Sequence, residues 1–298
     1  MNLSKQYKKK KYNNFAPKRK ILIHTSKTTI YIETKKIIER LYIQSIRRPA
    51  SLIINIIQPL LWLILFGSLF QNAPIYLFEK YQVQYREFLN PGIIVFAGFN
   101  SAINSGLPII FDREFGFLNR ILISPINNKN SLVYSCIIHT WSIAIIQILG
   151  ILLFTQYETQ NNTIFNINTL NINILISTII IINVSTISIF NALTLPGHVE
   201  FIALTTLLIN LPILFSSTAL APLSFMPTWL QAICCINPLT YATEIIRNQN
   251  LSKTIESTTE IINTEWLTIS IQQGILVLVL LSIFSILFVK KIIKYKYD

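Results

Sequence analysis

Apolar residues form six long stretches along the chain, separated by short polar or mixed segments. A helix that crosses the ~30 Å hydrocarbon layer of a bilayer needs ~20 mostly apolar residues, because backbone amides cannot stay unpaired in lipid. Buried core helices seldom reach this length, and six of them in one soluble chain would be exceptional. The pattern therefore predicts an all-α membrane protein with six transmembrane helices. The predicted spans cover residues 52–70, 91–110, 132–154, 172–195, 201–223 and 267–289.

Charged residues make up only 13% of the 298 residues and lie outside these stretches. An average soluble domain has roughly 25%. The net charge of +12 comes from 25 Lys and Arg, of which 14 precede Pro49 and four lie in the last nine residues. A nucleic-acid-binding protein gathers its basic residues on one folded face. Basic segments that flank an apolar middle instead indicate a membrane protein without a nucleic-acid partner.

The basic residues also predict an orientation. If the N-terminus lies inside, the inner segments hold 21 Lys and Arg and the outer segments hold four. The positive-inside rule then places both termini on the cytoplasmic or equivalent side.

None of the predicted spans contains Asp, Glu, Lys or Arg. Ion-coupled transporters and proton pumps usually carry such a group inside the membrane, so the sequence argues against ion-driven transport. The spans do contain neutral amides, among them Gln58, Asn100, Gln147 and Asn210. These amides either hydrogen-bond between helices or line a polar route, and both interpretations stay open.

The N-terminal region divides into two parts. Residues 1–29 form a basic tail without the apolar region of a secretory signal, so we expect this tail to remain and to bind anionic lipid head groups. In residues 30–49, apolar side chains share one helical face and basic side chains share the other. This arrangement predicts an amphipathic helix at the inner membrane surface.

The predicted inner loop between spans 2 and 3 has a helical period. Phe111, Phe115, Leu118 and Leu122 recur on one face, and Pro125 ends the pattern. We expect one short amphipathic helix over residues 111–125. A connector on the membrane surface explains its apolar face, whereas a docking element for a soluble partner also explains the cluster of acidic and basic residues at its start.

Residues 223–250, before the last span, are apolar but interrupted by Pro227 and Pro238. The segment is too short to cross the membrane twice, which favours a pair of re-entrant helices. An interfacial anchor that uses Trp229 and Tyr241 is the alternative.

Three small residues in span 2, Gly98, Ala102 and Gly106, recur every four positions. Such a face lets another helix approach closely. The sequence leaves open whether that helix belongs to the same chain or to a symmetry-related copy.

The sequence offers no evident catalytic, cofactor or metal site. None of its eight glycines belongs to a P-loop pattern, so we expect no ATP hydrolysis by this chain. The three cysteines have neither the number nor the spacing of a disulfide framework or a zinc site. Any energy for transport must then come from a partner.

These features together resemble the permease subunits of ABC-2-type ABC transporters. The resemblance rests on the six predicted spans, on the inner sequence REFGFLNRILISP that ends at Pro125, and on PTWLQ followed by NPLTY in the last outer segment. It implies that residues 111–125 are a coupling helix that contacts a separate ATPase subunit. The coupling residues would be Asp112, Arg113, Glu114, Gly116, Leu118, Arg120 and Pro125.

The resemblance further implies that the outer segment is a re-entrant gate. Its residues would be Pro227, Trp229, Asn237, Pro238, Tyr241 and Arg247. The family usually has an acidic residue where this chain has Asn119, so charge matching to the ATPase differs there.

The favoured hypothesis is an exporter permease that works as a homodimer, with ATP and Mg²⁺ bound by the ATPase subunit. Its substrate would be amphipathic, lipid-linked or glycan-like. A non-transporting membrane scaffold or assembly factor is the alternative. The chain's richness in Ile, Asn and Lys resembles the plastid-encoded branch of the family and suggests a plastid membrane, with a bacterial plasma membrane as the alternative.

Overall fold

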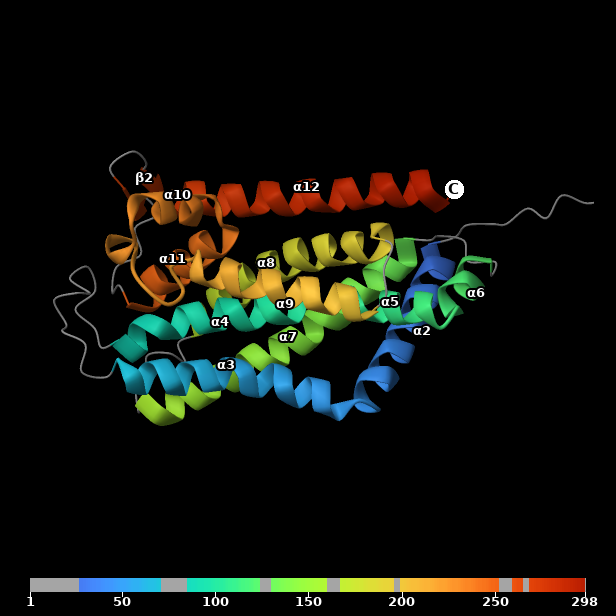
Figure 1. The fold of residues 1–298 in the computed structure, drawn as a ribbon, viewed down its shortest axis with the longest axis horizontal. Helices are drawn as coiled ribbons and strands as arrows, with labels where there is room; N and C mark the ends of the chain where they lie inside the picture. The colour runs from blue at the N-terminus through green and yellow to red at the C-terminus, as the bar shows by residue number, and fades with distance from the viewer. Residues whose placement is uncertain are drawn as a thin grey trace, which may run out of the picture.

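The computed structural model describes residues 27–70, 85–123, 130–159, 167–195, 199–251, 259–264 and 268–297. These residues form an elongated bundle of helices with one small pair of strands (Figure 1). The helices are α2 (Lys27–Ile46), α3 (Pro49–Leu69), α4 (Tyr85–Ile103), α5 (Leu107–Glu114), α6 (Phe117–Ile123), α7 (Asn130–Thr159), α8 (Ile167–Thr194), α9 (Val199–Phe215), the 3-10 turn η3 (Leu223–Phe225), α10 (Thr228–Ile236), α11 (Pro238–Leu251) and α12 (Ile271–Tyr297). The strands are β1 (Glu260–Asn263) and β2 (Thr268–Ser270).

Five segments in the described ranges are long and apolar enough to cross a membrane. They are Leu52–Leu69, Tyr85–Glu114, Asn130–Gln156, Ile167–Thr194 and Ile271–Lys291. The all-α membrane class predicted from the sequence is supported by these helices. They overlap five of the six predicted spans, and the remaining predicted span overlaps α9, which is shorter at 17 residues.

The prediction for residues 201–223 was wrong in its second half, because α9 ends at Phe215. The chain then turns, and the side-chain amide of Asn237 donates to the carbonyl oxygens of Ile213 and Ser216, each at 2.9 Å. These bonds replace those that a further helical turn would have made. A side chain 24 residues downstream of Ile213 therefore helps to end this helix.

Helix α4 forms the centre of the bundle. Nearly all of its residues are buried, and it packs against α3, α7, α8 and α11. A Cβ atom on Gly92 would lie 2.3 Å from the carbonyl oxygen of Ala219, so only glycine fits at that contact. The turn after α9 therefore lies directly against α4.

The bundle has two distinct ends (Figure 1). Helices α2, α5 and α6 and the C-terminal end of α12 lie at one end, which we call the α6 end. Helices α10 and α11 and the strand pair lie at the opposite end, which we call the α11 end. Both the basic helix α2 and the basic end of α12 thus lie at the α6 end.

Two further elements differ from the prediction or refine it. The sixth predicted span begins four residues too early, because Thr268–Ser270 pairs with β1 in an antiparallel ladder before α12 starts at Ile271. Ile262 and Ile269 of this pair are buried, and a short apolar run cannot be assigned to strand or helix by periodicity alone. The helix predicted over residues 30–49 overlaps α2, which starts three residues earlier and ends at Ile46. Pro49 starts α3 at a position that suits proline.

Candidate functional site

The predicted coupling segment contains two helices instead of one. Helix α5 ends at Glu114 and α6 starts at Phe117, with Phe115 and Gly116 between them. Gly116 has φ +70°, a left-handed conformation that glycine adopts without strain and that commonly ends helices. The expectation of one continuous helix over 111–125 was therefore wrong, since helical periodicity does not register a change of chain direction. Pro125 lies outside the described residues.

Arg113 connects the coupling segment to α8. Its guanidinium nitrogen Nη1 donates to the carbonyl oxygen of Leu195 at 2.7 Å and to that of Ala192 at 3.0 Å. The last carbonyl oxygens of a helix lack partners within the helix and carry partial negative charge, which a guanidinium stabilises. Arg113 thus caps the C-terminal end of α8 and fixes α5 to it.

Asp112 connects the same segment to α2. It is buried and forms an ion pair with Arg40 of α2. The Arg40 guanidinium carbon also lies 4.2 Å from the centroid of the Phe117 ring in α6. One α2 side chain therefore holds both α5 and α6. The sequence analysis placed Arg40 only on the polar face of α2, because nothing local links it to a residue 72 positions away.

The remaining coupling residues divide between the core and the surface. Leu118 is buried and packs in the same cluster as Leu41 of α2. Glu114 and Arg120 are exposed, and Phe115 is 75% exposed. A large exposed aromatic ring between an acid and a base is suited to contact with another protein. The turn thus presents a surface outward while its neighbours Asp112 and Arg113 hold the bundle.

The small-residue face of α4 packs within the chain. The Cβ position of Gly98 lies 3.4 Å from Ile181 of α8, and that of Gly106 lies 2.7 Å from the carbonyl oxygen of Ser188. Ala102, between them, is fully buried. The structure places this face against α8 of the same chain.

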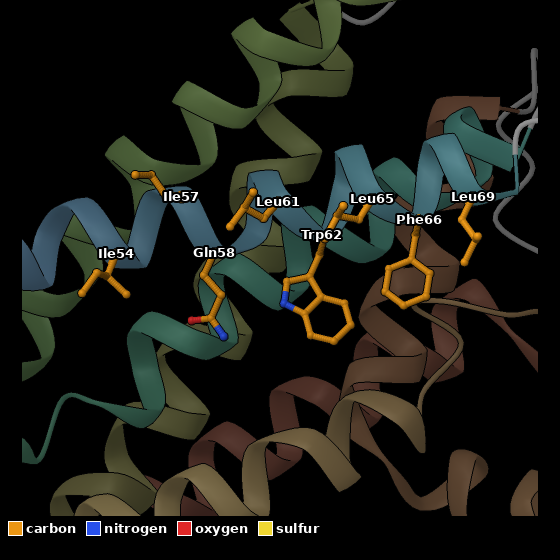
Figure 2. A pocket seen from close by; sticks show the side chains of 8 residues that line it. All are labelled: Ile54, Ile57, Gln58, Leu61, Trp62, Leu65, Phe66 and Leu69. Atoms are coloured by element: carbon orange, nitrogen blue, oxygen red, sulfur yellow. The ribbon is translucent and has the colours of Figure 1, made fainter.

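The face of α3 borders a largely apolar cavity of about 660 Å³, which is open on one side and lined by residues of α3 alone. Figure 2 shows Gln58, Trp62 and Phe66 extending from the same side of α3. The Trp62 and Phe66 rings stack with centroids 5.2 Å apart, and Trp62 also meets Phe215 of α9 edge to face. Apart from Gln58, the lining consists of Ile54, Ile57, Leu61, Trp62, Leu65, Phe66 and Leu69.

Side-chain amides bridge three helices beside this cavity. The side-chain N–H of Asn100 in α4 donates to the side-chain oxygen Oε1 of Gln58 at 3.2 Å. The side-chain N–H of Asn210 in α9 donates to the side-chain oxygen Oδ1 of Asn100 at 3.1 Å. The sequence identified these amides but could not pair them. An apolar surface with one polar strip suits an amphipathic molecule.

The α11 end contains the residues predicted for an outer gate. Asn237 links α9 to α11, because its side-chain oxygen also accepts the Leu239 N–H at 3.0 Å as a helix cap. Pro238 is the first residue of α11, and the Tyr241 hydroxyl donates to the Cys235 carbonyl oxygen. These contacts hold α10 and α11 in a fixed mutual position.

The other three predicted gate residues lie in contrasting environments. Pro227 and Trp229 are exposed beside α10, with Trp229 65% exposed. Arg247 is fully buried. It forms an ion pair with Glu244, lies over the Phe88 ring, and donates to the carbonyl oxygens of Phe88 at 3.2 Å and Thr218 at 2.7 Å. Arg247 thus joins α11 to α4 and to the turn after α9.

Within the described residues, no three His, Cys, Asp or Glu side chains are grouped so as to hold a metal ion.

The comparisons with known proteins agree with this geometry. The model of the ABC-2 type transporter family matches residues 33–250. Relatives named "Putative transport permease ycf38" are 44% identical in Porphyra purpurea, over 88% of this chain and 89% of the relative, and 43% identical in Cyanophora paradoxa, over 87% and 88%. A third, in Pyropia yezoensis, is 45% identical over 89% of each chain.

These relatives form a plastid-encoded branch, and the family match covers the predicted coupling segment, the α3 face, α10 and nearly all of α11. The family's membrane domain is a non-catalytic transporter subunit. The chain therefore belongs to the ABC-2 type transporter family and has the role of a transport permease in a membrane.

Proposed function

We propose that the protein is the membrane subunit of an ATP-driven exporter and works as a homodimer with a separate ATPase subunit. One observation carries the ATPase contact: Glu114, Phe115 and Arg120 are exposed on the turn whose neighbours Asp112 and Arg113 hold α2 and α8. A partner that pushes on this surface pushes on two helices at once. ATP and Mg²⁺ bind to that partner.

The contacts of the turn define how force would travel. Motion of α5 displaces Arg113 and the end of α8, and the Asp112–Arg40 pair makes α2 follow. Helix α8 packs against α4, α11 and α12, which extend toward the α11 end. Charge-assisted hydrogen bonds suit this task because they are shorter and stronger than neutral ones.

The proposal includes a membrane arrangement. Helix α9 serves as the sixth span, since its 17 residues lie at the lower end of the ~17–25 that suffice. Both termini then lie on the stromal side of a plastid membrane, where α2 is the interfacial amphipathic helix and the basic tail meets anionic lipids. At the opposite side, α10 and α11 form the re-entrant pair.

The cavity beside α3 supports an amphipathic, lipid-linked or glycan-like substrate. The apolar lining accommodates hydrocarbon, the Gln58–Asn100–Asn210 bridge offers hydrogen bonds, and the Trp62 ring can stack on a flat or sugar-like group. Only 17% of the α3 span is buried within one chain, which leaves its outer face for a second copy or for lipid. The transport route would run between the two copies.

The ATPase contact is tested by Phe115→Asp and Arg120→Glu. The full chain is purified from its own membrane, bound ABC ATPase is identified by mass spectrometry, and ATP hydrolysis is measured with and without substrate lipid extract. Each variant should lose the ATPase while inserting normally. Arg47→Glu changes an exposed charge at the same basic end and is the control. This variant should retain the bound ATPase.

If both variants retain a hydrolysing ATPase, the turn is not the coupling site. If the unaltered chain is recovered without any nucleotide-binding subunit, the scaffold hypothesis replaces the exporter.

A further inference from the structure

A second cavity, of about 370 Å³, lies at the α6 end, separate from the α3 face, and borders the predicted coupling segment at Phe111. It is an open cavity lined by the end of α2, the start of α3, the turn between α4 and α5, and α7. Its polar lining includes Gln44, Ser45, Arg48, Asn104 and His139. Ser45 and His139 are already hydrogen-bonded to each other at 2.9 Å, which joins α2 to α7 at the cavity wall.

The cavity is electrostatically suited to an anion. Among the described residues that line it, Arg48 is the only charged one, and none of them is Asp or Glu. The guanidinium carbon of Arg48 lies 4.6 Å from the centroid of the Phe111 ring, so the side chain lies beside α5. Helix α3 starts next to Arg48 without a side-chain cap, and Leu52 in its first turn lines the cavity. The N–H groups of such a helix start add partial positive charge.

Most of the surface of the same cavity is apolar. Leu41, Leu52, Leu107, Pro108 and Ile143 contribute hydrocarbon surface beside the polar groups. A free inorganic anion gains nothing from that surface, whereas a molecule with an anionic head and an apolar chain can contact both the polar and the apolar parts of the lining. The volume falls within the range of small-molecule sites, about 300–1,000 Å³.

The position of the cavity relative to the membrane span also favours a lipid as its ligand. Arg48 precedes by one helical turn the apolar span that starts at Leu52. In the membrane arrangement proposed above, on which this inference rests, that is the depth of the head groups. Basic side chains there gain ~1 kcal/mol each from anionic lipids.

We propose that this cavity binds the phosphate or sulfonate head group of one anionic lipid from the inner leaflet. The bound lipid contacts Arg48 and the start of α3 with its head and the Leu52 side with its chain. Because Phe111 of α5 and His139 of α7 also line the cavity, the lipid steadies the α2–α3 junction against the coupling segment. Coupling thereby becomes sensitive to the lipid composition of the inner leaflet.

The test measures lipid retention by native mass spectrometry on the full chain, purified in detergent and supplied with equal phosphatidylglycerol and phosphatidylcholine. The unaltered chain should retain phosphatidylglycerol preferentially, with one molecule per chain. Arg48→Gln should lower this retention about tenfold, the loss expected for one charge-assisted contact. Arg48→Lys should keep most of it.

Arg47→Gln is the matched control, since Arg47 is adjacent and exposed but does not line the cavity. It should leave retention unchanged. Leu52→Trp fills the cavity without changing any charge and should abolish retention. The midpoint of thermal unfolding without added lipid verifies that each variant is folded, and variants at another lining position, such as Ile143→Trp, replace any that is not.

Equal losses in Arg47→Gln and Arg48→Gln would show a diffuse basic surface and overturn the proposal, as would equal retention of phosphatidylcholine. Displacement of the lipid by excess inorganic phosphate would show a free-anion site instead and also overturn it. The measurement needs no ATPase. A chain that retains the lipid but never couples ATP hydrolysis would therefore refute the proposed function and leave this inference intact.

Discussion

Both ends of the bundle contain an arginine paired with a carboxylate, in different surroundings. At the α11 end, Arg247 is fully buried, pairs with Glu244 in the same helix, and binds backbone carbonyls of two other segments. At the α6 end, the Arg40 side chain is 26% exposed and pairs with Asp112 in another helix. The first pair is part of the interior, whereas the second joins two surface elements.

This difference indicates what each pair does. A buried cation with several fixed partners resists movement, because any displacement leaves charge unpaired in an apolar interior. In the second pair Asp112 is buried as well, but water reaches the Arg40 guanidinium, so this cation can lose a contact at smaller cost than Arg247. We infer that the α11 end is a rigid anchor and the α6 end a joint.

The largest effect is expected from Arg247→Met, which leaves Glu244 as a buried charge without its ion-pair partner. The change should destabilise the protein by ~3–5 kcal/mol, seen as a lower midpoint of thermal unfolding in detergent and low yield. The double variant Glu244→Leu with Arg247→Met removes both charges and should recover much of the loss. If Arg247→Met alone were as stable as the unaltered chain, the α11 end would not be a rigid anchor.

The next effect concerns the contact between α4 and the turn after α9. Gly92→Ala places a methyl group 2.3 Å from the Ala219 carbonyl oxygen, so backbone must move at a cost of ~1–3 kcal/mol. Gly150→Ala is the control, because no atom outside its immediate surroundings lies within 4 Å of its Cβ position. The control should be neutral or slightly stabilising, and equal unfolding midpoints for the two variants would contradict a tight α11 end.

Asp112→Asn tests the joint. Because Arg40 can reach water, we expect a loss of stability of only ~1–2 kcal/mol, but a large loss of substrate-stimulated ATP hydrolysis in the complex with the ATPase. Lys36→Gln breaks an exposed pair within α2 and should change neither quantity. A variant that loses stability but keeps full coupling would make Asp112 a structural residue only.

The smallest change in stability is expected for the amide bridge, which lies between the two ends of the bundle. Asn100→Ala removes the central amide of the bridge between α3 and α9, and interhelical hydrogen bonds in membranes contribute ~0.6–1.7 kcal/mol. Unfolding midpoints should shift slightly, and Asn171→Ala, at an exposed position outside the bridge, should cause no shift. A shift as large as that of Arg247→Met would show that the bridge, too, is an anchor.

The helical membrane class and most of the spans could be predicted from the sequence, because length and apolarity alone decide whether a helix can cross a bilayer. The exact ends of the helices could not be predicted. The end of α9 depends on the side chain of Asn237, and the break at Gly116 depends on a backbone conformation that periodicity does not encode.

The coupling residues were predicted as one group, and the structure divides them. The pattern of charges around Phe115 predicted a coupling segment, but it could not show that Asp112 and Arg113 face the bundle while Glu114 and Arg120 face outward. Which side of a short helix is covered depends on the helices packed against it, here α2 and α8.

The sequence by itself determined that this chain is a helical membrane protein with basic flanks, because hydrophobicity and charge are properties of each segment alone. The tertiary structure decided which polar groups meet. Arg40 and Asp112 are 72 residues apart, and Arg247 and Phe88 are 159 apart. Such pairs form only when packing of the whole bundle excludes water around them, and this is a property that no single segment possesses.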